Sequence, residues 1–282
     1  MKLSICIITY NHQDYISQTL DAVLQQVCNF DVEIIIGEDM SIDNTRKICA
    51  EYAEKNPGRI NLLHTEKNLG MMRNFLRTLK ACSGKYIAFC EGDDYWTDPY
   101  KLQKQVDFLE ANPGYSACFH NATIKNERKD EEWEWIMHDK GLPKDTFTTE
   151  DVLGPWFIAS PSFVFVNYPD FELPEWFTNC SYGDLPYMLL LTLRGSFKYI
   201  NEVMCVYRLH DGGMTTVHKA YDKIMVMVYI YASFDIYTKY KYHEAIRKAV
   251  IYEVDRHSSP KEIVVPKQKK SFVAVLKEYL KN

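Results

Sequence analysis

The chain has 282 residues, of which 46% are hydrophobic, 14% aromatic and 25% charged. This composition is that of a globular protein with a sizeable core, and it excludes a disordered, collagen-like or disulfide-scaffold chain. The net charge is −5, from 33 basic and 38 acidic residues, so the chain has no general positive field to hold the phosphates of a nucleic acid. We expect no nucleic-acid partner.

The eight cysteines and the short apolar runs indicate a protein of a reducing compartment. No two cysteines have the CxxC spacing of a zinc site, and several lie inside apolar runs, where reduced cysteine packs as a small hydrophobe. The apolar run near the N-terminus is too short for a signal peptide, and no window reaches the roughly 18 consecutive apolar residues of a membrane span. We therefore expect a cytoplasmic protein that is neither exported nor membrane-spanning.

From Lys2 to about Ala111, short apolar β-rich runs alternate with segments of helical period, which is typical of βαβ units and a largely parallel sheet flanked by helices. The predicted strands are Leu3–Ile8, Val32–Ile36, Ile60–Leu63 and Tyr86–Cys90. The predicted helices are Tyr15–Gln26, Thr45–Asn56, Met71–Ala81 and Lys101–Ala111.

The length predicts one large domain with an appendage. We expect a main domain over residues 1–215, with halves at about 1–111 and 112–215, and a helical extension over 216–282. In the second half the pattern predicts strands at Ser116–Asn121, Ser162–Val166 and Phe197–Arg208, a charged loop at Lys125–Trp135, and helices at Thr149–Leu153 and Leu185–Leu193. In the extension it predicts a long helical pattern from Val217 to about Asp255, a polar link at Ser258–Lys270, and an amphipathic helix at Ser271–Leu280.

Ligands of such sheets bind at the carboxyl ends of the strands, which directs attention to the loops there. The first of these loops, Thr9–Asp14, contains no glycine, so the GxGxxG dinucleotide motif and the GxxxxGK[ST] phosphate loop are both missing. This disfavours hydride-transfer enzymes and phosphate-loop NTPases. The second loop, Gly37–Asn44, carries three carboxylates, which could accept hydrogen bonds from a base or ribose. The alternative is that Asp43 or Asn44 caps the next helix and the neighbouring acids are solvated.

A third loop, Glu91–Pro99, concentrates acidic side chains. Glu91, Asp93 and Asp94 directly follow the apolar strand Tyr86–Cys90, and clustered carboxylates repel one another unless a cation neutralises them. Their oxygens suit Mg²⁺ or Mn²⁺, whose coordination substrate phosphates commonly complete. The spacing therefore predicts a metal–diphosphate site. The alternative is a turn in which Asp93 or Asp98 caps the following helix.

The sequence resembles a family 2 glycosyltransferase with the glycosyltransferase-A fold, of the bacterial surface-polysaccharide type. The resemblance covers about residues 1–215 and depends on several motifs in order, which together are far more specific than one acidic cluster. The matching segments are Ser4–Asn11, Glu33–Asp39 with Ser41, Asp43 and Thr45, Asn68-Leu69-Gly70 with Asn74, Glu91–Pro99 with Lys101-Leu102, Gly183-Asp184, and Tyr207–His210.

The resemblance implies inverting transfer of a sugar from a nucleotide-diphosphate donor, first of all a UDP-sugar, to a hydroxyl of a glycan or lipid-linked acceptor, with Mn²⁺ or Mg²⁺ as cofactor. Glu91 stands where the family has the first aspartate of its DxD motif, and Asp39 where the family binds the base. The residues implied at the donor are Thr9, Tyr10, Asn11, Asp39, Asn68, Asn74, Glu91 and Asp93. Those implied at the metal are Asp93, Asp94 and His210.

Asp184 matches the position of the catalytic base in the family. Inverting transfer needs a carboxylate that takes the proton of the acceptor hydroxyl, and the preceding Gly183 allows a close backbone approach. The alternative role of Asp184 is to cap the helix Leu185–Leu193, and the two roles are compatible. For His210, the alternative to metal or diphosphate contact is an ordinary exposed loop histidine.

The charged loop of the second half and the C-terminal segment say less about function. Trp133 and Trp135 could stack on a sugar ring of the acceptor. The basic and apolar end of the chain, Lys267–Leu276, fits a helix packed on its own domain or on a second subunit as a homodimer, or peripheral contact with an anionic membrane.

Two other functions use the same acidic cluster. The first is a metal-dependent phosphohydrolase or nucleotidyltransferase, which would need basic residues in the site loops, where few occur. The second is a non-catalytic nucleotide-sugar binding protein, which the retention of Asp93, Asp94 and Asp184 disfavours.

Overall fold

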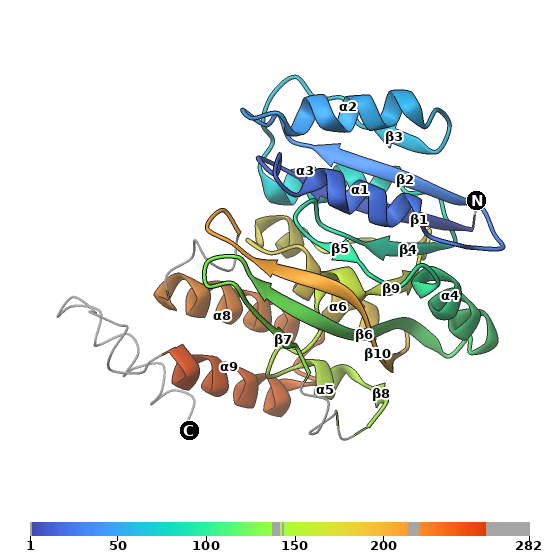
Figure 1. Ribbon diagram of the computed structural model, residues 1–282. Coiled ribbons are helices and arrows are strands. Elements are labelled where there is room, and N and C mark those ends of the chain that lie inside the picture. Colours follow the sequence, from blue (N-terminus) through green and yellow to red (C-terminus); the bar gives the residue numbers. More distant parts are fainter. Residues whose placement is uncertain (1, 137–141, 143, 214–219, 258–282) are drawn as a thin grey trace.

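The computed structural model describes residues 2–136, 142, 144–213 and 220–257 (Figure 1). Its first part contains the four strands and four helices that the hydrophobic pattern predicts, at nearly the same boundaries. In chain order they are β1 (Leu3–Thr9), α1 (Ile16–Leu24), β2 (Val32–Glu38), α2 (Thr45–Lys55), β3 (Ile60–Leu62), α3 (Met71–Ala81), β4 (Tyr86–Phe89) and α4 (Lys101–Ala111).

The parallel core of the sheet explains why the site loops meet. β1 pairs with β2 on one side and with β4 on the other, both in parallel, and β3 adds to the far side of β2. These strands are apolar nearly throughout because helices cover both faces of a parallel sheet. The carboxyl ends of β1, β2 and β4 therefore lie at one edge, where the loops 9–14, 37–44 and 90–95 come together.

The second half adds antiparallel pairs to this core. The strand order is β3-β2-β1-β4-β9-β6-β10-β5, with β9 antiparallel to both β4 and β6. The expected α/β sheet flanked by helices is confirmed, and the complete sheet is mixed. The elements of this half are β5 (Tyr95–Trp96), β6 (Tyr115–Asn126), β7 (Glu131–Glu134), β8 (Thr146–Phe147), α5 (Thr149–Val152), η1 (Ser160–Ser162), β9 (Val164–Val166), η2 (Glu175–Asn179), α6 (Asp184–Thr192) and β10 (Ser196–Leu209).

The predicted charged loop at Lys125–Trp135 is wrong in part. Residues Glu131–Glu134 form β7, which pairs antiparallel with the end of β6 as a hairpin. The sequence of β7 is EEWE, and its side chains are largely exposed, so no apolar alternation marks it as a strand. Main-chain pairing with β6 forms the strand instead.

The long helical pattern from Val217 to about Asp255 contains a break that the sequence did not indicate. Two helices, α8 (Ala220–Tyr237) and α9 (His243–His257), stand in its place. The turn between them holds Lys239 and Tyr240 in the left-handed region, with φ of 53° and 61°. The turn contains neither glycine nor proline, so the sequence carries no signal for this break.

The C-terminal helices pack side by side at the end of the molecule opposite α2 and β3 (Figure 1). Their buried side chains belong to the same hydrophobic cluster as Phe75, Phe89 and Phe165 of the sheet region. The members from the two helices are Ile224, Met227, Ile230, Tyr231, Phe234, Ile246, Ala249, Val250 and Val254. The extension is therefore anchored through shared core packing.

The predicted link Ser258–Lys270 and helix Ser271–Leu280 lie outside the described residues, so membrane contact and homodimerisation through this segment stay predictions. Among the helices described, none has the length and apolar character needed to cross a bilayer.

Candidate active site

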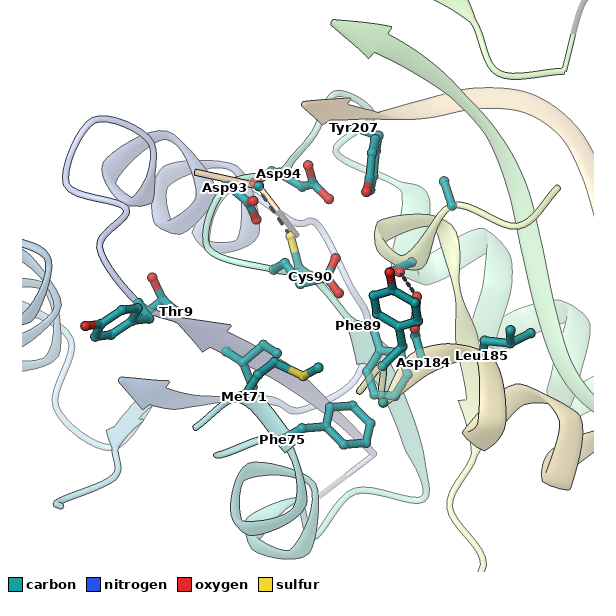
Figure 2. Close-up of a pocket in the computed structure, with 18 of the residues that line it drawn as sticks. Thr9, Met71, Phe75, Phe89, Cys90, Asp93, Asp94, Asp184, Leu185 and Tyr207 are labelled. Carbon is teal, nitrogen blue, oxygen red and sulfur yellow. Dashed lines mark hydrogen bonds between the residues drawn. The ribbon is translucent and has the colours of Figure 1, made fainter. Parts of the chain in front are cut away.

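A cavity of about 580 Å³ lies at the carboxyl edge of the parallel strands (Figure 2). Both halves of the main domain line it, and α8 and α9 add Lys223, Met227, Glu253 and Arg256. In Figure 2, Asp93 and Asp94 lie on one side of the cavity and Asp184 on the other, with Tyr207 at the edge. The acidic loop and the expected base therefore face one space.

The acidic loop after β4 is fixed by backbone contacts. Gly92 N donates to Ile8 O of β1, and Thr19 Oγ1 of α1 lies 2.7 Å from Asp94 O and 3.1 Å from Gly92 O. A Cβ on Gly92 would lie 2.4 Å from Thr9 Oγ1 and 3.1 Å from His12 Nδ1. Glycine is therefore required here because the loop passes directly against β1 and the loop that follows it.

Asp93 lies between two histidines. Its Oδ2 is 3.0 Å from His210 Nε2 and 3.7 Å from His12 Nε2, and one ligand atom from each residue lies within 4.8 Å of the others. Burial opposes ionisation of Asp93, but His12 and His210 outweigh it and lower the pKa of this carboxyl. Burial in turn lowers the pKa of His12. The three residues form a compact group that could hold a divalent cation.

The structure thus brings the predicted pair Asp93 and His210 together and adds His12. His12 is not among the metal ligands predicted from the sequence. Its position directly after β1, at the edge of the sheet where ligands bind, was the available signal.

Asp94 points away from this group. Its Oδ1 accepts a hydrogen bond from Arg208 N at 2.8 Å, so it fastens the end of β10 to the acidic loop. The Arg208 guanidinium donates to Asp93 O and lies 4.4 Å from the centre of the Tyr95 ring. Within the described residues Asp94 is not part of the metal-competent group, and its role as a ligand stays a prediction.

Burial and the acidic cluster raise the pKa values of Glu91 and Asp94. The pKa of Glu91 is raised well above its usual value. Burial is the largest cause, followed by the nearby negative charges of Asp94 and Asp184. Burial and then Asp93 likewise raise the pKa of Asp94. Four carboxyl groups thus share one poorly hydrated region, a situation that a bound cation relieves.

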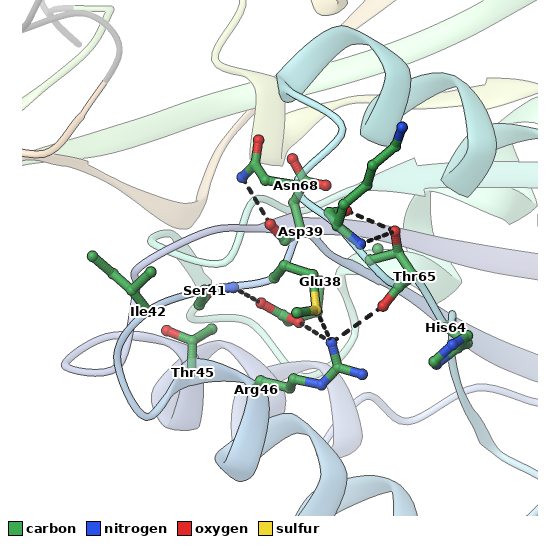
Figure 3. Close-up of polar contacts among 12 residues, drawn as sticks. Glu38, Asp39, Ser41, Ile42, Thr45, Arg46, His64, Thr65 and Asn68 are labelled. Carbon is green, nitrogen blue, oxygen red and sulfur yellow. Dashed lines mark hydrogen bonds and ion pairs between the residues drawn. The ribbon is translucent and has the colours of Figure 1, made fainter.

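Asp39 and Asn68 also line the cavity and contact each other. The two carboxylate oxygens of Asp39 accept hydrogen bonds from Leu69 N and Gly70 N at 2.8 and 2.9 Å. Asn68 Nδ2 donates to Asp39 O at 2.8 Å (Figure 3). Asp39 therefore holds the turn at residues 68–70, and a nucleotide base would have to share its oxygens.

The remaining predicted donor residues divide into two groups. Thr9 and Tyr10 line the cavity. Asn11 does not: its Oδ1 accepts from Ile42 N at 3.0 Å and so links the first two loops. Asn74 lines the cavity but is bound to the framework, because its Nδ2 donates to Gly37 O at 2.6 Å.

Asp184 is the first residue of α6, and its Oδ2 accepts a hydrogen bond from Ser160 Oγ at 2.6 Å. The N-cap of the helix is Gly183, so the alternative in which Asp184 caps the helix is not realised. Gly183 is needed because a Cβ there would lie 2.9 Å from the Phe75 ring. Of the two tryptophans considered for the acceptor, only Trp135 lines the cavity, while Trp133 is 43% exposed.

Comparison with known proteins places the chain in a family. The family model described as Glycosyl transferase family 2 matches residues 4–167. The putative teichuronic acid biosynthesis glycosyltransferase TuaG of Bacillus subtilis is 37% identical over 218 residues, 74% of this chain and 79% of that protein. Uncharacterized proteins of Mycobacterium tuberculosis and Mycobacterium bovis are 34% identical over 228 residues, 78% of this chain. The chain spans 61% of the length of these mycobacterial relatives.

Solved structures support the fold. S. aureus TarS residues 1–349, solved in complex with UDP-GlcNAc, matches with a TM-score of 0.69 at 16% identity, covering 99% of this chain and 80% of that one. The mannosyltransferase PcManGT of Pyrobaculum calidifontis, solved with GDP-Man and Mn²⁺, matches with a TM-score of 0.58 at 14% identity, covering 99% and 84%. The expected glycosyltransferase-A fold is confirmed.

Proposed function

Because the chain belongs to glycosyl transferase family 2, we propose that it transfers a sugar from a nucleotide-diphosphate donor to a hydroxyl group of a surface glycan or lipid-linked acceptor. The observation that carries the proposal is the placement of His12, Asp93 and His210 on one side of a single cavity and Asp184 on the other. This arrangement provides a place for the diphosphate and a base for the acceptor.

Asp184 is the base of the proposed reaction. The acceptor oxygen forms a bond to the anomeric carbon while the bond from that carbon to the diphosphate oxygen breaks, and the electron pair leaves with the nucleoside diphosphate. The acceptor proton goes to Asp184. The acceptor oxygen attacks the face of the sugar opposite the leaving group, and the configuration at the anomeric carbon is therefore inverted. Ser160 binds Oδ2 of this carboxylate, and Oδ1 makes no hydrogen bond to the rest of the described chain.

His12, Asp93 and His210 would hold a divalent cation. Two of the three ligand atoms are imidazole nitrogens, so Mn²⁺ fits this set better than Mg²⁺, which prefers oxygen ligands. When bound, the cation would stabilise the negative charge that develops on the departing diphosphate. PcManGT, crystallised with GDP-Man and Mn²⁺, supports this choice of metal, and TarS, crystallised with UDP-GlcNAc, supports a UDP-sugar as the first donor to test.

The first experiment measures thermal stabilisation of the purified protein by nucleoside diphosphates and nucleotide sugars, each with Mn²⁺ and with EDTA. Ligands that bind the native state raise the melting temperature by mass action. A Mn²⁺-dependent rise selective for one base is expected. If no nucleotide raises the melting temperature, the proposed function is contradicted. Hydrolysis of the diphosphate itself would favour the phosphohydrolase alternative.

The second experiment tests the base. Asp184→Asn should lower the rate of transfer or donor hydrolysis by about 10²- to 10⁴-fold with donor affinity retained, because a positioned base contributes about that much. Asp170→Asn, at an exposed aspartate that pairs with Arg194, is the matched control. Near-normal rates in Asp184→Asn would exclude Asp184 as the base.

A further inference from the structure

The short turn η1 carries Ser160, whose hydroxyl donates to the carboxylate of the proposed base Asp184. We propose that Ser160 in this turn is the positioning residue of Asp184, and that a buried network starting at Trp96 holds Ser160 in place. This inference depends on the proposed role of Asp184 as the base.

The contact between Ser160 and Asp184 decides which carboxylate oxygen faces the reaction. Ser160 Oγ donates to Oδ2 at 2.6 Å, and the Ser160 side chain is buried at the cavity wall. With Oδ2 engaged, the rotation of the carboxylate is restricted and Oδ1 is left to accept the proton. A base is effective only within hydrogen-bond reach of the proton it removes, so this restriction acts directly on rate.

Two side chains from outside the turn bind its backbone. Trp96 Nε1 donates to Pro161 O, and Gln105 Nε2 donates to Ser162 O, both at 2.9 Å. Trp96 and Gln105 are themselves buried. Each carbonyl that follows Ser160 in the turn is therefore tied to the layer formed by β5 and α4.

Lys101 connects these two donors. Its side chain is fully buried, its Nζ lies 4.2 Å from the centre of the Trp96 ring, and it donates to Gln105 Oε1 at 2.8 Å. One ammonium group thus orients both the indole and the amide that bind the turn. A charge is costly to bury without partners. Here the ammonium group contacts Trp96 and Gln105, and both of these side chains donate to the turn that contains Ser160.

The network begins at the acidic loop itself. Trp96 lies two residues after Asp94 and pairs with Cys205 of β10, so the loop that carries Asp93 and the turn that carries Ser160 share one support. The separation between the donor side and the base is therefore set by buried contacts and not by the exposed loops.

The test compares the wild-type protein with Ser160→Ala, Ser160→Thr and the matched control Ser116→Ala. Ser116 is a buried serine of β6 that does not line the cavity, and its Oγ donates to Gly195 O. The assay follows release of nucleoside diphosphate in the presence of Mn²⁺ and without acceptor, where water takes the place of the acceptor hydroxyl. UDP-GlcNAc is the first donor probe, followed by any donor that the binding panel selects, and donor affinity is measured in parallel by calorimetry.

For Ser160→Ala we expect kcat to fall roughly tenfold or more, while the donor KM and Kd change less than about twofold. The fall in kcat is a part of the about 10²- to 10⁴-fold rate increase that a positioned base supplies. Ser160→Thr, which retains the hydroxyl, should recover most of the rate, and Ser116→Ala should match the wild type. A folded Ser160→Ala protein with wild-type kcat, or one that loses donor affinity in proportion to rate, would overturn this inference alone. A wild-type protein that turns over no nucleotide sugar would overturn the proposed function and this inference with it.

Discussion

The buried Lys101 predicts an unusual dependence of stability on pH. Burial lowers the pKa of Lys101 to about 8, from the ordinary value of 10.5 that applies in the unfolded chain. Between these two values the unfolded chain binds more protons than the native protein, so the contribution of this residue to stability increases as the pH rises. Below pH 8 the native protein carries the full cost of burying the charge.

The size of the effect follows from the two pKa values. A difference of about 2.5 units corresponds to about 3 kcal/mol in total, at 1.36 kcal/mol for each unit. From pH 7.5 to pH 9.5 the part recovered is about 2 kcal/mol. Buried thiols act in the opposite direction, since burial raises the pKa of Cys118 to about 12, so the wild-type curve alone does not isolate the lysine.

The assay is therefore a difference between two proteins. Urea unfolding of the wild type and of Lys101→Met is measured from pH 7.5 to 9.5, and the free energy of unfolding of the wild type should gain about 2 kcal/mol relative to the variant. Lost contacts to Trp96 and Gln105 shift the variant by an amount that does not depend on pH. Lys47→Met, at an exposed position of α2, controls for loss of one charge. A difference that stays constant across this range would refute the argument that Lys101 is charged at the cost of burial.

Two further predictions concern the metal side of the cavity. Gly92→Ala places a Cβ 2.4 Å from Thr9 Oγ1, so the free energy of unfolding should fall by about 1–3 kcal/mol and the Mn²⁺-dependent thermal shift with UDP should be lost; an unchanged shift would show that the loop tolerates displacement. His12→Gln should weaken Mn²⁺ binding in the presence of UDP by about tenfold or more, measured by calorimetry, whereas His64→Gln should not; equal affinities would remove His12 from the ligand set.

The sequence predicts the parallel half of the fold well because its central strands β1, β2 and β4 are largely buried on both faces. Such strands are nearly continuous apolar runs between turn residues, and β4 with the acidic loop after it is the clearest case. The hairpin strand β7 lacks this signal because main-chain pairing alone makes it a strand. The break between α8 and α9 lacks it because Lys239 and Tyr240 adopt left-handed backbone without any glycine.

The candidate site divides in the same way. Sequence motifs select Asp93, His210 and Asp184 because their types and order follow the family. They do not indicate which of the two adjacent acids meets the histidines: Arg208 N donates to Asp94 Oδ1, and only Asp93 lies within reach of His12 and His210. The contact of Ser160 with Asp184 joins residues 24 positions apart across an irregular segment, where no periodicity applies.

The contacts that the sequence does not reveal share one property: they fix groups from distant segments relative to one another. Arg208 ties β10 to the acidic loop through Asp94, and Trp96 ties the strand after that loop to the turn of Ser160. The reacting groups at Asp93 and Asp184 thus depend on a common buried support. Because a displacement of about 1 Å at a reacting centre can cost about 10²-fold in rate, substitutions in this support should reduce turnover more than they reduce donor affinity. The division of effects between rate and affinity therefore distinguishes this support from residues that contact the donor directly.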